Sequence, residues 1–111
     1  MTSIFDKLVP IVSRYDEIEQ LMADPGVSTD FGRIQGLAKE RATLDELVDF
    51  STKHKKLLKE QMDLQALVSD GGDQELVAMA REEFESVEDQ LVGLAEALQF
   101  ALLPKDPNDE R

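Results

Sequence analysis

The chain has 111 residues and a formal net charge of -12, from 12 lysines and arginines against 24 aspartates and glutamates. This balance argues against a general nucleic-acid-binding surface, because neutralising phosphates needs clustered cations, and no DNA partner is expected. With no cysteine and a single histidine, the sequence excludes disulfides, thiolate chemistry and the usual zinc ligand sets, so no cofactor is expected.

The chain offers no sign of a membrane or of export. Its start, Met1 to Asp6, lacks the charged-then-apolar pattern of a signal peptide. No apolar run approaches the roughly 20 residues that span a bilayer. We therefore expect a cytoplasmic protein without a membrane partner. Aromatic residues are few, which argues against a deep ligand pocket.

The first predicted helix covers about residues 3–23. Pro10 lies one to two turns inside it, where a proline is able to kink a helix. Asp24, Pro25 and Gly26 end it, with Gly26 free to adopt the positive φ of a turn. Its apolar positions are spaced by three and four, as on one helical face: Ile4, Leu8, Ile11, Tyr15, Ile18 and Met22.

The second predicted helix covers about residues 30–69, with Ser28, Thr29 and Asp30 as alternative N-caps. At this length it would extend roughly 60 Å. A polar break at residues 51–56 divides its apolar positions. The first half has two stripes, Leu37 with Leu44 and Leu47 with Phe50, and the second half has Leu57, Leu58, Leu64, Leu67 and Val68.

The third predicted helix covers about residues 73–103, after a tight turn at Gly71 and Gly72, with Asp73 as its N-cap. Its apolar residues alternate steps of three and four, which is typical of a coiled-coil seam. The seam positions are Val77, Ala80, Phe84, Val87, Leu91, Leu94, Leu98 and Ala101.

These elements predict an all-α fold. The short turn makes the second and third helices an antiparallel hairpin, in which Lys59 is level with Phe84 and Phe50 with about Gly93. The first helix is long enough to cover the second only as far as about Phe50. We therefore expect one N-terminal domain, residues 1–103, with an antiparallel three-helix bundle at one end and a two-helix coiled-coil arm at the other.

One basic cluster interrupts the acidic chain on the second helix: Lys53, Lys55, Lys56 and Lys59. It has two interpretations. The lysines contact RNA, or they pair with Glu83, Glu85 and Glu88 across the hairpin. The pairing is favoured, because flanking residues of antiparallel hairpins often form such pairs.

Three further features have structural interpretations. His54 has no catalytic or metal-binding partner in the pattern, so a solvated histidine or one at the edge of the seam is favoured over a ligand or a proton carrier. The acidic stretch around residues 82–89 is a solvated face, since an arm of two helices has no pocket to perturb its carboxylates. Gly71 and Gly72 lack the lysine of a phosphate-binding loop and are read as a turn.

The last predicted segment, residues 104–111, contains Pro104, Pro107, Asn108 and Asp109, which do not continue a helix. We expect an extended polar strap. Such a strap at the end of a coiled coil suggests that another domain follows.

Several segments together resemble the N-terminal domain of bacterial peptide chain release factors. The strap from Leu102 to Glu110 is similar to the class that reads UAA and UAG. Further similar segments are residues 4–8, residues 24–27 and residues 75–83.

The resemblance implies a role in docking. In that family the catalytic Gly-Gly-Gln loop and the codon-reading tripeptide lie beyond the strap, so no residue of this chain inherits a catalytic role and it is not expected to be an enzyme. The resemblance implies the ribosome as partner, at the stalk base or GTPase-associated region. It also implies proximity to the methyltransferase that modifies release factors.

Two other functions stay open on the sequence alone. A free-standing helical adaptor or oligomerising coiled coil would suit the heptads but not the strap. An arm that holds tRNA would need a basic surface, whereas the third helix is acidic.

Overall fold

Five helical segments follow one another along residues 3–103, the part of the chain that this computed structural model describes. These residues contain no β-strand, which confirms the predicted all-α class. The predicted strap at residues 104–111 lies outside the described residues. The chain divides into two units, Met1–Lys55 and Lys56–Arg111, and each is described by itself below.

The N-terminal helix differs from its prediction, because the segment is divided. A 3-10 helix, η1 (Ile4–Leu8), comes first, and its capping box joins Ser3 and Asp6 through reciprocal bonds to backbone N–H groups. The α-helix α1 (Val9–Ala23) then begins with Pro10 in its first turn. Proline is tolerated there since the N–H that it lacks has no helical partner, so Pro10 helps to begin α1 and does not kink it.

A short helix, α2 (Pro25–Ser28), replaces the turn predicted at Gly26. The Asp24 carboxylate accepts a hydrogen bond from the Gly26 N–H at 2.8 Å, and Pro25 occupies the first helical position. Both features favour a helix start. Gly26 does not use its freedom to adopt a positive φ; among the described residues, Gly71 and Gly72 are the ones that do.

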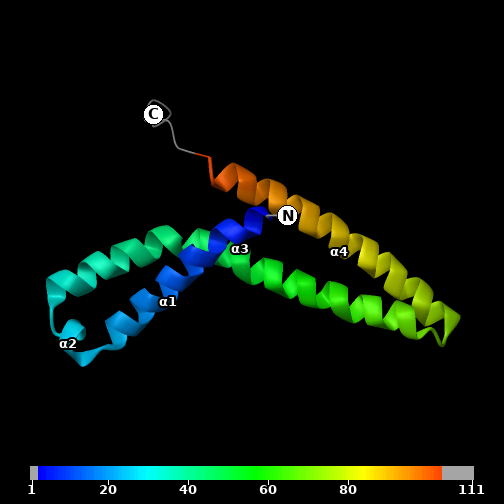
Figure 1. Ribbon diagram of the computed structural model, residues 1–111, viewed down its shortest axis with the longest axis horizontal. Coiled ribbons are helices and arrows are strands. Elements are labelled where there is room, and N and C mark those ends of the chain that lie inside the picture. Colours follow the sequence, from blue (N-terminus) through cyan, green and yellow to red (C-terminus); the bar gives the residue numbers. More distant parts are fainter. Residues whose placement is uncertain (1–2, 104–111) are drawn as a thin grey trace. The chain divides into compact units, whose positions relative to one another are not determined.

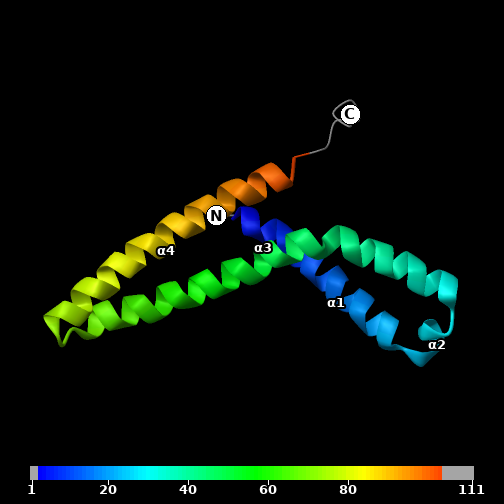
Figure 2. The ribbon, with the colours of Figure 1, turned by 180° about the vertical axis from the view of Figure 1, so that it is seen from behind.

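The core of the first unit joins α1, α2 and the first part of α3 (Phe31–Asp70), as Figures 1 and 2 allow the reader to follow. Ile18, Val27 and Leu37 form its buried cluster. Asp30 begins α3, since its carboxylate accepts a hydrogen bond from the Arg33 N–H at 3.2 Å. Four half-buried residues pack against the cluster: Leu21, Met22, Ile34 and Leu44.

The second unit is the predicted antiparallel hairpin. Figure 1 shows α4 (Gln74–Ala101), in yellow and orange, running back beside the green second half of α3, and Figure 2 shows the same pairing from behind. Gly71 and Gly72 make the turn with φ of 72° and 93°. Asp73 caps α4 by accepting a hydrogen bond from the Glu75 N–H at 2.9 Å. The helix ends at Ala101, about two residues before its predicted end.

The predicted seam of α4 is confirmed. Ala80, Val87 and Leu98 are buried, the other five seam positions are half-buried, and none is exposed. The register across the hairpin differs from its prediction. Phe84 lines two surface hollows together with α3 residues between Gln61 and Val68. It therefore lies level with a part of α3 about one helical turn or more beyond Lys59.

The buried seam predicts unequal effects for one substitution at two sites of α4. Val87→Ala should lower the free energy of unfolding by roughly 1.5–3 kcal/mol, because it removes two buried methyl groups and leaves a cavity. Val92→Ala should leave it nearly unchanged or slightly higher, since Val92 is 59% exposed and alanine favours a helix. Urea denaturation of both variants measures the difference. Equal losses would place Val87 outside the seam.

Candidate functional site

The basic cluster on α3 is the candidate binding surface. Its four lysines, Lys53, Lys55, Lys56 and Lys59, are exposed. Residues three and four apart are neighbours on a helix, so Lys56 and Lys59, and likewise Lys55 and Lys59, lie on one side of α3. Lys53 pairs with Asp49 one turn earlier, at 3.1 Å between Nζ and Oδ2. Such an exposed pair competes weakly with a ligand.

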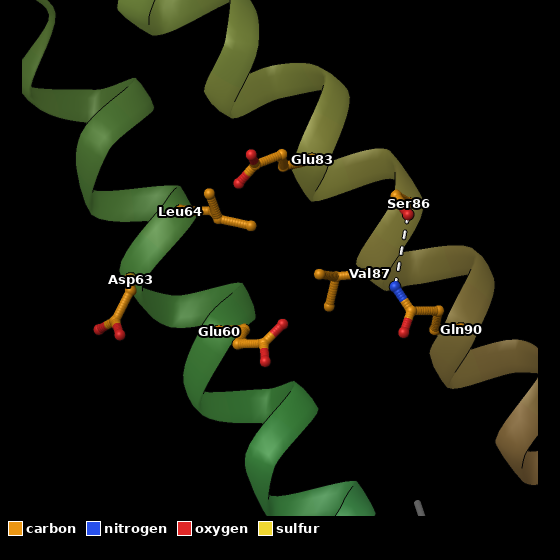
Figure 3. Close-up of a pocket in the computed structure, with 7 residues that line it drawn as sticks. All are labelled: Glu60, Asp63, Leu64, Glu83, Ser86, Val87 and Gln90. Atoms are coloured by element: carbon orange, nitrogen blue, oxygen red, sulfur yellow. Dashed lines mark hydrogen bonds between the residues drawn. The ribbon is translucent and has the colours of Figure 1, made fainter.

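The predicted pairing across the hairpin does not form for Lys56 and Lys59. Within residues 56–103, no lysine nitrogen of α3 lies within 4.0 Å of a carboxylate of α4. The shifted register is the reason. In Figure 3, Glu83 lies across from Leu64, which is one helical turn of α3 beyond Glu60. The ammonium groups of Lys56 and Lys59 therefore stay available to an external anion.

An open groove runs between α3 and α4 in the second unit. Figure 3 shows Leu64 and Val87 pointing toward one another at its floor, while Glu60 and Glu83 flank them. Gln90 donates a hydrogen bond to the Ser86 hydroxyl on the same helix, at 3.3 Å. The groove displays the carboxylates of Glu60, Asp63 and Glu83 at the open surface of the hairpin.

His54 has a structural partner that the sequence did not indicate. Its imidazole stacks on the Phe5 ring, with centroids 3.6 Å apart and planes 3° apart. Burial lowers the pKa of His54, and the nearby Asp6 carboxylate opposes that effect more weakly. The ring is half-buried in this stack and is therefore not the solvated histidine that was one of the two favoured interpretations. The stack joins η1 to the middle of α3.

Ion pairs between α1 and α3 hold the polar rim of the first unit. Arg14 donates two hydrogen bonds to Glu40, at 2.6 Å and 2.8 Å, in a bidentate arrangement. The bonds lower the pKa of Glu40 below its usual value and raise that of Arg14. Arg41, the next residue of α3, donates hydrogen bonds to the Tyr15 hydroxyl and to the Glu19 carboxylate of α1. These pairs are 22 to 26 residues apart, and the sequence pattern carries no signal for them.

Residues 3–103 contain no group of three or more histidine, aspartate or glutamate side chains arranged to hold a metal ion. None of the helices in this range combines the length and apolar composition that crossing a membrane needs. What the described surface offers is therefore a set of exposed helical faces, among which the basic cluster is the concentrated cationic one.

Comparison with known proteins identifies a family. Residues 11–111 match the PCRF domain. Over all 111 residues, the chain is 37% identical to a protein of Ligilactobacillus salivarius named "Peptide chain release factor 1". Proteins of the same name from Campylobacter concisus and Staphylococcus aureus are 37% and 34% identical over 96% and 97% of the chain.

The chain spans about a third of the length of these relatives: 31% of the Ligilactobacillus protein, 29% of the Campylobacter protein and 30% of the Staphylococcus protein. No solved structure matches the chain.

The stacked histidine predicts a titration below the ordinary pKa of 6.5. The folded state then favours neutral imidazole, so the stability that depends on His54 is complete above pH 6.5 and is lost as the pH falls through the lower folded pKa. Proton NMR of this single imidazole measures the pKa directly. Phe5→Ala should move it back toward 6.5 by hydrating the ring. A wild-type value at or above 6.5 would contradict the stacked burial.

Proposed function

Because this chain belongs to the PCRF domain family, we propose that it is the N-terminal, ribosome-docking part of a translation termination factor. The longer protein, here called the parent factor, recognises UAA and UAG and triggers hydrolysis of peptidyl-tRNA. The observation that carries the proposal is the match, over 96% to 100% of the chain, to three proteins named as release factors.

The chain itself has no catalytic role in this proposal. Its described residues supply no metal-binding group, and its open groove has carboxylates but no paired nucleophile and base. Codon reading and hydrolysis belong to the remaining two thirds of the parent factor. The contribution of the chain is to position that remainder on the ribosome.

The partner is the ribosome at its stalk base, in the GTPase-associated region. The basic cluster on α3 is the contact that we assign to ribosomal RNA. Three of its lysines, Lys55, Lys56 and Lys59, are exposed and spaced along one side of the helix, as a row of phosphate contacts requires. The methyltransferase that modifies release factors is a second partner, reached through the parent factor.

Deleting residues 1–103 from the parent factor tests the docking role. We expect slower association with stop-programmed ribosomes, and UAA and UAG still preferred over sense codons, because no base-reading residue is removed. Release rates on ribosomes programmed with each codon measure both properties. Loss of the preference for UAA and UAG, or an unchanged association rate, would contradict the proposal.

Charge reversal tests the assigned contact. Lys55→Glu, Lys56→Glu and Lys59→Glu together should weaken ribosome binding and flatten its salt dependence, with a slope smaller by about one for each lost phosphate contact. Lys53 is left unchanged because it pairs with Asp49. The melting temperature should stay the same, since Lys56 and Lys59 pair with no acid of α4 in residues 56–103.

The matched control reverses three exposed cations outside the cluster, namely Lys7, Arg33 and Lys39. It changes the net charge equally, so it reports any general electrostatic effect. Equal weakening in both triple variants would refute a specific contact. A lower melting temperature with unchanged affinity would show that the cluster stabilises the fold instead.

A further inference from the structure

The helix α4 carries a second apolar surface on the side opposite its seam. Val92 is 59% exposed and Phe100 is 77% exposed, and Leu103, just after the helix, is 60% exposed. Val92 and Phe100 are eight residues apart, which places them about 80° apart around the helix, and both point away from the seam. We call Val92, Phe100 and Leu103 the outer stripe. The seam residues beside it, Leu91, Leu94 and Leu98, face the other way and are half-buried or buried.

The size of the outer stripe limits what it can hold. An aromatic side chain buries about 150–250 Å², so these three side chains offer a few hundred Å² at most. A stable interface between free proteins needs about 800 Å² on each partner. A second copy of the chain is disfavoured further by the net charge of -12, which makes two copies repel. The stripe therefore suits a partner that is already tethered nearby.

We propose that the outer stripe is the docking surface for the segment of the parent factor that follows residue 111. This inference rests on the proposed function, in which the chain is one part of a protein about three times its length. A covalent tether gives such a segment an effective concentration in the millimolar range, and a small apolar contact is then sufficient to keep it bound.

The tether is long enough for this contact. The eight residues 104–111 can span about 28 Å when extended. The stripe from Val92 to Leu103 measures about 17 Å along the helix. A segment that begins after residue 111 can therefore reach every residue of the stripe.

The charge of the stripe defines the chemistry of its occupant. Glu96 lies four residues from both Val92 and Phe100, so its exposed carboxylate stands between them on the same side of α4. The matching surface is apolar with a lysine or arginine placed against Glu96. Docking would then restrict how freely the parent factor's two parts move.

Cysteine labelling of the whole parent factor tests the proposal, because residues 1–111 contain no natural cysteine. Val92→Cys is compared with Met79→Cys, a position of α4 with the same exposed fraction, 59%, outside the stripe. Each labelling rate, read by mass spectrometry of the peptide, is divided by its rate in denaturant. The 111-residue chain with each substitution is the reference.

We expect Val92→Cys to be labelled about tenfold or more slowly in the parent factor than in the 111-residue chain, which corresponds to about 1.4 kcal/mol in favour of docking. Met79→Cys should be labelled equally in both. Adding Phe100→Asp and Leu103→Asp should restore fast labelling at position 92.

Three outcomes would overturn the inference. Equal labelling at position 92 in both proteins would show an uncovered stripe. Protection that grows with the concentration of the 111-residue chain would assign the stripe to a second copy. Protection at position 79 as strong as at position 92 would show no specific contact. Failure of the proposed function is seen separately, as an absence of stop-codon-dependent release by the parent factor.

Discussion

Burial along narrow helix seams is the interaction on which the rest of this structure depends. Among the described residues, seven hydrophobic side chains are buried and no polar or charged one is. In the hairpin of α3 and α4, each helix packs one face against the other. Long helices gain most of their stability from such packing and not from propensity, so each buried side chain carries a large share of a small total.

The same constraint distributes the charges. Because carboxylates are excluded from the seams, they occupy the outer faces, where water solvates them. In the first unit, some are paired across helices, as in the bidentate contact of Arg14 with Glu40. Across the hairpin of the second unit, the described residues form no such pair, and Glu60 and Glu83 flank an apolar floor. The basic cluster on α3 is thus a local exception on an acidic surface.

Features set by local periodicity were predictable from the sequence. The seam of α4, the cap at Asp73 and the glycine turn all follow from residues a few positions apart. Contacts between distant residues were not predictable, such as the stack of Phe5 on His54 or the burial of Val27 in α2. The register of the hairpin was also missed, because the packing of side chains from two helices decides it and a count of residues from the turn does not capture that packing. The different register leaves Lys59 without the expected pairing to Glu83, which changes how the candidate site is interpreted.

A narrow seam has a consequence for function. A hairpin that packs one face of each helix can carry binding residues on its exposed faces without cost to the core. On α4, the seam holds Val87 and Leu98, while Phe100 on the outer side is 77% exposed and contributes little to folding. Separate faces of one helix can therefore serve packing and docking independently. Such a division suits a domain that positions a catalytic partner, because positioning requires defined surfaces at fixed spacing and needs neither a pocket nor a reactive group.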